Sequence, residues 1–109
     1  MIIVRITMYA LPEKHLEVMQ TLLSMIRPID QEKGCLGYAV FCDIGDRNCF
    51  SLLQEWATRE DLDRHIESSR FGVLLGTKAL LMAPLKIQIH SVIKSEGMEA
   101  VHAVRKKSN

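Results

Sequence analysis

The chain has 109 residues, enough for one domain with a substantial core but not for two. Hydrophobic residues make up 48% of it and charged residues 25%, which is the composition of an ordinary globular protein. The formal net charge is only +1, and the basic residues cluster only at the end, in Arg105-Lys106-Lys107. This distribution argues against a general nucleic-acid-binding protein, because phosphate contacts need clustered Lys and Arg.

Neither a membrane partner nor a secretory leader is expected. The apolar start of the chain is interrupted at Arg5 and Thr7 before the apolar region of a signal peptide could form. The longest apolar run, residues 79–85, contains Pro84 and is far too short to cross a bilayer. We therefore expect a cytoplasmic protein.

The cysteines recur at intervals of seven residues, at Cys35, Cys42 and Cys49. This spacing matches no metal-ligand pattern, and the histidines show no metal-binding spacing either. In a reducing compartment the three side chains stay thiols. The sequence therefore predicts buried, inert cysteines and no metal site.

The first half of the chain predicts a strand followed by a long helix. Residues 2–9 alternate between two faces and include β-branched side chains, which is typical of a strand. Pro12 then suits the first turn of a helix. Apolar residues follow at spacings of three and four: Leu16, Met19, Leu22, Leu23, Ile26 and Ile29. Pro28 should kink or end this helix, and Gly34 should form the turn after it.

A hairpin and a short helix come next. Residues 36–43 and 49–56 predict two strands, and the turn-forming residues 44–48 connect them. Thr58 is the expected N-cap of a helix that runs through His65 to Phe71, since acidic residues fill its first turn.

The last third predicts a second helical piece and a final strand. The helical piece spans roughly residues 72–82 and is ended by Pro84. Apolar residues over 85–93 then indicate a strand. Residues 1–94 form the expected domain. Residues 95–109 form a C-terminal tail, with one marginal helical turn or two.

The element order β-α-β-β-α-β is typical of an α+β ferredoxin-like fold, a split βαβ arrangement with one antiparallel sheet. Helices can cover only one face of that sheet, yet its strands carry apolar residues on both faces. A homodimer that packs two sheets face to face would bury the second face. Glu55 points to the opposite face from Trp56, so we expect a structural ion pair there, with Arg5 as a candidate partner.

The stretch from Trp56 to Phe71 is where we expect a pocket. Trp56 is the only tryptophan and ends a strand, and His65 lies at the edge of the buried face of the next helix. A histidine has an ordinary pKa near neutrality and can serve as a base. Asp61, one turn earlier, is a candidate to orient its ring.

Several of these residues together resemble one family. Gly34-Cys35-Leu36-Gly37-Tyr38, then Phe50, then Glu55-Trp56, His65 and Phe71 look like the antibiotic biosynthesis monooxygenase (ABM) domain family, over about residues 2–93. The resemblance implies a dimeric ferredoxin-like α+β barrel. Family members act as cofactor-free quinol or polyketide monooxygenases, as haem degraders or as isomerases. Haem degradation is not expected, because the first-strand Asn and the Trp–His pair of that branch are missing.

The resemblance implies a small cofactor-independent monooxygenase that uses dioxygen on a quinol-like or other small aromatic substrate. The protein would supply a dry apolar pocket, an aromatic wall and a base. Trp56 and His65 are then the catalytic candidates, and Trp56, His65, Phe71 and Tyr38 the substrate-binding ones. A structural interpretation competes with this, in which Trp56 anchors the core and His65 holds the helix to the sheet.

Two other functions fit the same scaffold. One is a non-catalytic ligand-binding or stress-response module. The other is an isomerase of a small metabolite, which would need several polar groups in the pocket. The sequence offers six candidates: Arg5, Thr7, Ser51, Gln54, His65 and His90.

Overall fold

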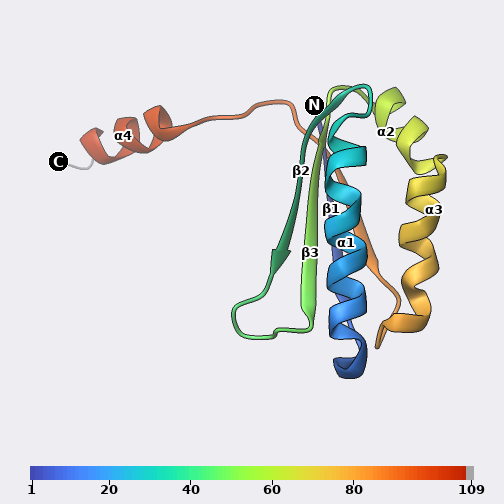
Figure 1. Cartoon of the computed structure of the whole chain (residues 1–109). Coiled ribbons are helices and arrows are strands. Elements are labelled where there is room, and N and C mark those ends of the chain that lie inside the picture. Colours follow the sequence, from blue (N-terminus) through green and yellow to red (C-terminus); the bar gives the residue numbers. More distant parts are fainter. Residues whose placement is uncertain (108–109) are drawn as a thin grey trace.

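The computed structural model describes residues 1–107 of the chain. A four-stranded antiparallel sheet has the strand order β2-β3-β1-β4, and helices cover one of its faces (Figure 1). The strands are β1 (Ile2–Tyr9), β2 (Cys35–Cys42), β3 (Cys49–Trp56) and β4 (Lys86–Ser91). The helices are η1 (Pro12–Lys14), α1 (His15–Asp30), α2 (Arg59–Ile66), α3 (Ser69–Leu75), η2 (Gly76–Leu80) and α4 (Met98–Lys107). The α+β ferredoxin-like fold is confirmed.

The core lies between the sheet and its helices, because successive side chains of the two central strands point to opposite faces of the sheet. β1 and β3 pair in register from Ile2 opposite Trp56 to Tyr9 opposite Cys49. Their inward side chains are buried: Ile2, Val4, Ile6, Met8, Phe50, Leu52, Gln54 and Trp56. Helix α1 adds a buried stripe at spacings of four and three residues: Val18, Leu22, Met25 and Ile29.

Two helix boundaries differ from the sequence prediction. Pro28 does not end α1, which continues to Asp30. The helix expected to run from Thr58 to Phe71 is two helices, because α2 ends at Ile66 and Ser68 starts α3 by accepting a hydrogen bond from the backbone N–H of Phe71 (3.3 Å). A side-chain cap of this kind favours a new helix start over a continuous helix.

The predicted burial of all three cysteines is wrong. Cys42 is exposed, and Cys35 and Cys49 are half-buried. The pKa of each of the Cys35 and Cys49 thiols is raised above its ordinary value, mainly because burial removes water from the charged form. These two side chains are therefore weak nucleophiles near neutral pH.

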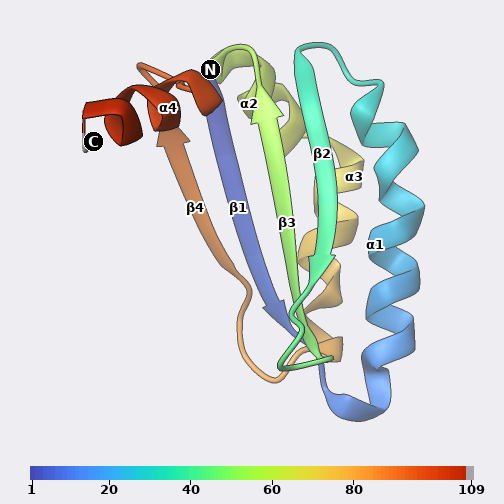
Figure 2. The same cartoon turned by 90° about the vertical axis from the view of Figure 1, so that its left-hand side faces the viewer.

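The second face of the sheet, here called the open face, is turned toward the viewer in Figure 2, with α1, α2 and α3 behind the strands. It carries the outward side chains of β1 and β3, and Phe41 of β2 is 52% exposed. Glu55 lies opposite Ile3, whereas Arg5 lies opposite Leu53. Among the ion pairs of residues 1–107 none joins Glu55 to Arg5, so the expected pair does not form within the chain.

The C-terminal tail is more ordered than its sequence predicts. Residues 98–107 form the ten-residue helix α4 in place of one or two marginal turns. The remainder of the predicted tail, residues 108 and 109, lies outside the described residues. Within residues 1–107, no helix has both the length and the apolar character that crossing a membrane requires.

Candidate functional site

Two elements bring Trp56 and His65 together. The alternation of β3 turns Trp56 toward the helices. Thr58 then caps α2, because its hydroxyl accepts a hydrogen bond from the backbone N–H of Asp61 (3.1 Å). This start point turns Leu62 and His65 inward, where both are buried. The imidazole of His65 stacks on the indole of Trp56 with ring centroids 4.8 Å apart and planes 27° apart.

Phe71, from α3, completes a cluster of three rings. Its ring meets His65 edge-on, with centroids 5.5 Å apart and planes at 89°. Trp56 is 0%, His65 1% and Phe71 5% exposed. His65 is thus a titratable group in an almost dry aromatic environment, which requires a hydrogen-bond partner to be stable there.

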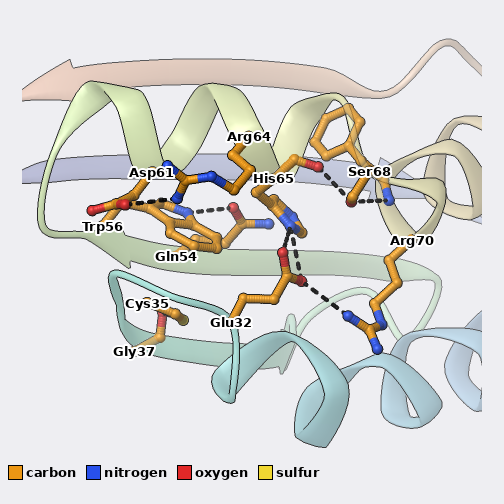
Figure 3. A network of polar contacts seen from close by, with 11 residues as sticks. Glu32, Cys35, Gly37, Gln54, Trp56, Asp61, Arg64, His65, Ser68 and Arg70 are labelled. Carbon is orange, nitrogen blue, oxygen red and sulfur yellow. Dashed lines mark hydrogen bonds and ion pairs between the residues drawn. The ribbon is translucent and has the colours of Figure 1, made fainter.

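That partner is Glu32, in the turn that follows α1. Its two carboxylate oxygens lie 3.0 and 3.1 Å from Nδ1 of His65 (Figure 3). Nη1 of Arg70 lies 3.8 Å from the same carboxylate. A carboxylate accepts a hydrogen bond from Nδ1–H, which leaves Nε2 as the acceptor of the neutral ring. None of the hydrogen bonds of residues 1–107 uses Nε2.

The sequence prediction that Asp61 orients His65 is wrong. The Asp61 carboxylate accepts hydrogen bonds from the Thr58 hydroxyl (2.9 Å) and from Nη1 of Arg64 (3.0 Å). These two contacts, the Thr58 bond first, lower the pKa of Asp61 below its ordinary value. Asp61 also packs on Gly34, where an added Cβ would overlap the Asp61 carboxylate. Asp61 therefore fixes the start of α2 against the Gly34 turn.

Two polar side chains beside the ring cluster have an unsatisfied hydrogen-bonding group. Gln54 is fully buried; its Oε1 accepts a hydrogen bond from Nε1 of Trp56 (3.0 Å), but its Nε2 has no partner among residues 1–107. The hydroxyl of Tyr38 has none there either. The pKa of the Tyr38 hydroxyl is raised above its ordinary value, mainly because burial disfavours the charged form. Tyr38 and Gln54 lie opposite each other on β2 and β3.

An unsatisfied buried polar group costs about 1–3 kcal/mol, so native proteins keep few of them. These two groups, on neighbouring strands beside a buried histidine, are candidates to contact a ligand.

All four site residues that the sequence suggested lie on the helix side of the sheet: Trp56, His65, Phe71 and Tyr38. Glu32 was missed, because 33 residues separate it from His65 and no local pattern marks it.

No arrangement suited to a metal ion occurs in the described part of the chain, since residues 1–107 contain no group of three or more His, Cys, Asp or Glu side chains that could hold one. A groove of about 440 Å³ lies elsewhere, on the open face. It is formed by β1 and the β2–β3 hairpin and does not include Trp56 or His65.

Known proteins match this chain in sequence and in fold. The family model named antibiotic biosynthesis monooxygenase (ABM) matches residues 1–74. YcnE of Bacillus subtilis, a candidate monooxygenase, is 30% identical over 88 residues, which cover 80% of this chain and 93% of YcnE. An uncharacterised Synechocystis protein, sll1783, is 27% identical over 78% of this chain and 58% of its own length.

Solved structures agree on the architecture. PA3566 from Pseudomonas aeruginosa has a TM-score of 0.76 and 26% identity, covering 85% of this chain and 94% of its own. A candidate antibiotic biosynthesis monooxygenase from Deinococcus radiodurans reaches a TM-score of 0.83 at 23% identity, covering 89% of this chain and 97% of its own, and so supports the fold. The match of the family model over two thirds of the chain shows that this protein belongs to the antibiotic biosynthesis monooxygenase family.

Proposed function

We propose that this protein is a cofactor-independent monooxygenase that uses dioxygen to oxidise a quinol-like or other small aromatic molecule. Membership of the family supports the oxygenase class. The observation that carries the proposal is His65, which is held between Trp56 and Phe71 with its Nδ1 tied to the Glu32 carboxylate.

His65 is the proposed base. With Nδ1–H donated to Glu32, Nε2 can accept the acidic proton of the substrate. The resulting electron-rich anion passes one electron to dioxygen, and the two radicals then combine to a peroxide on the substrate. Loss of water leaves one oxygen atom on the product and places the other in the water, so no outside reductant is consumed.

The neighbouring residues would bind the substrate. The face of Trp56 provides an aromatic wall, and the unsatisfied groups of Gln54 and Tyr38 can hydrogen-bond a ring oxygen. Phe71 packs directly against His65 and would have to turn aside to admit a ring. A dry site of this kind also protects the reactive anion and peroxide from water.

We also infer a homodimer that packs the two open faces together. No helix among α1, α2 and α3 covers this face (Figure 2), and it carries apolar side chains such as Ile3, Leu53 and the half-exposed Phe41. An uncovered patch of this kind is a common feature of association surfaces. Light scattering after size-exclusion chromatography measures the mass directly.

Oxygen uptake tests the proposed reaction. The purified protein is mixed with a panel of hydroquinones and hydroxyanthrones, and uptake is followed with an electrode. The product is then analysed by mass spectrometry after reaction under ¹⁸O₂. We expect incorporation of one ¹⁸O atom, and loss of about 10²-fold or more in kcat for His65→Gln, the usual scale for a general base.

His102→Gln, on the exposed helix α4, is the matched control and should retain activity. If His65→Gln turns over as fast as the unmodified protein, His65 is not the base. If no substrate in the panel consumes oxygen while aromatic ligands still bind, the protein is a ligand-binding module of this fold.

A further inference from the structure

Gln54 is a polar side chain that the fold places among uncharged ones. It lies two residues before Trp56 on the helix side of β3 and is fully buried. Its neighbours across the sheet are Val4 on β1 and Tyr38 on β2. Neither carries a charge near neutral pH, because burial raises the pKa of the Tyr38 hydroxyl. A buried amide destabilises a fold unless both of its ends are hydrogen-bonded, and among residues 1–107 only the oxygen of this one is.

Trp56 fixes which end of the amide is free. The indole Nε1–H can only donate, so it must face the amide oxygen of Gln54, which accepts its hydrogen bond at 3.0 Å. The amide nitrogen therefore points the other way, and it has no acceptor among residues 1–107. Flipping the amide would break the indole hydrogen bond and bring two donors together. Trp56 thus presents the free end of Gln54 as a hydrogen-bond donor.

This donor is turned toward His65. In Figure 3 the amide of Gln54 points its oxygen toward Trp56 and its nitrogen toward the imidazole, and the imidazole itself stacks on the indole at 4.8 Å. With Nδ1–H of His65 donated to Glu32, Nε2 is the acceptor of the neutral ring. The site therefore offers one donor and one acceptor from neighbouring side chains.

A hydroxyl group satisfies both. A hydroxyl oxygen can donate its proton and accept a hydrogen bond at the same time, whereas an ether oxygen or the carbonyl oxygen of a quinone can only accept. Once the proton has passed to Nε2 of His65, the oxygen is an anion, and hydrogen bonds to a charged acceptor are roughly twice as strong as those between neutral groups. The Glu32 carboxylate stabilises the imidazolium that results. The two side chains thus fit a free hydroxyl and favour its ionised form.

We propose that Gln54, oriented by Trp56, is a specificity-determining residue that joins His65 in binding one free hydroxyl of a hydroxyarene and holding it as the anion. In this step the O–H bond breaks, an N–H bond forms at Nε2, and the electron pair stays on the oxygen, so no oxidant is needed. Gln54 contacts the substrate, whereas Trp56 is a positioning residue whose N–H is used by the amide. The inference rests on the proposed function for the identity of the base, but it requires no reaction with dioxygen.

A phenol that dioxygen does not attack tests this binding without turnover. We choose para-nitrophenol, because its anion absorbs visible light and its neutral form does not. Titrated into the unmodified protein at a pH below its own pKa, it should bind as the anion. The methyl ether para-nitroanisole should bind about tenfold more weakly or worse, because it leaves Nε2 of His65 unpaired. Equal binding of the two, bound nitrophenol in its neutral form, or no binding of nitrophenol overturns the proposal.

Gln54→Met removes the donor and nearly keeps the length of the side chain. The bound nitrophenol should lose most of its anion absorbance, and its dissociation constant should rise about tenfold or more, the scale of one hydrogen bond to a charged group. Gln88→Met, the same change on the exposed strand β4, is the matched control and should alter neither quantity. An unaltered anion spectrum in folded Gln54→Met overturns the role of Gln54.

Trp56→Phe tests the positioning role. It keeps an aromatic face beside His65 but removes the N–H that orients the amide, so the anion absorbance of bound nitrophenol should fall. In the Gln54→Met background the same change should have no further effect, whereas additive losses would show that Trp56 does not act through Gln54. Where Gln54→Met does not fold, an unchanged spectrum in Trp56→Phe overturns the proposal.

The outcomes separate this inference from the proposed reaction. If nitrophenol binds as the anion through Gln54 and no hydroquinone consumes oxygen, the binding role stands and the proposed reaction fails. If Gln54→Met keeps full kcat/KM in oxygen uptake, the proposed reaction stands and the role of Gln54 fails.

Discussion

The imidazole of His65 and the carboxylate of Glu32 are 3.0 Å apart, although 33 residues separate them in the chain. His65 is 1% exposed at its side chain and Glu32 17%, so water competes little for this contact. The pair ties α2 to the turn after α1 and fixes which ring nitrogen is left as an acceptor for the proposed substrate. Its geometry is that of a base with an orienting carboxylate.

Glu32→Gln tests this positioning role. The amide cannot hold the Nδ1–H tautomer as strictly, because it can present either an acceptor or a donor to Nδ1. We expect kcat to fall about 10–100-fold, the usual cost of losing the partner that orients a functional histidine, with little change in KM. Glu17→Gln, on the exposed face of α1, is the control. A parallel rise in KM with unchanged kcat would instead assign Glu32 to substrate binding or local structure.

Gly34→Ala should destabilise the fold strongly, because Gly34 has φ +82° and packs on Asp61. An alanine there adds backbone strain and a Cβ in contact with the carboxylate. We expect the free energy of unfolding to fall by about 2 kcal/mol or more, as measured by denaturant titration. Gly72→Ala, where a Cβ meets nothing within 4 Å, should be neutral or stabilising. Equal effects of both substitutions would contradict the steric argument.

Local patterns in the sequence account for the parts of the fold that were predicted well. The strand predicted over residues 49–56, after the turn-forming residues 44–48, has the same bounds as β3. The Thr58 cap and the Gly34 turn also form as expected, since each depends on residues only a few positions away. Trp56 and His65 come close for the same reason, one from a strand end and one from the first turns of the next helix.

Features set by particular side-chain hydrogen bonds, whether to distant or to nearby residues, were missed. Glu32 contacts His65 only after the α1–β2 turn folds back over α2, and Asp61 is drawn instead to Thr58 and Arg64. The break between α2 and α3 was missed because Ser68 competes for the backbone N–H of Phe71, an interaction that apolar periodicity does not reveal.

Acid should weaken the fold in part through Asp61. Its pKa is lower in the folded chain than the ordinary value of about 3.9. The stability that the ionised Asp61 carboxylate adds to the fold is therefore complete above about pH 4. This stability is lost as pH falls through the lowered pKa of the folded state. Asp61→Asn should flatten the decline of unfolding free energy between about pH 4 and pH 2. Asp63→Asn, which alters an exposed pair on the same helix, should leave that decline intact. An identical acid profile for Asp61→Asn would remove Asp61 as a source of the pH dependence.

Tyr38→Phe separates a ligand contact from packing. The hydroxyl of Tyr38 is buried without a hydrogen-bond partner among residues 1–107, so its removal should leave stability unchanged or raise it by about 1 kcal/mol. If this hydroxyl contacts the aromatic substrate, kcat/KM should nevertheless fall about tenfold, the scale of one lost hydrogen bond. Tyr9→Phe, at the far end of β1 and on the open face, should keep kcat/KM. A stabilised Tyr38→Phe protein with full activity would mean that Tyr38 only packs against the core, and Gln54 would then be the remaining polar contact for the substrate.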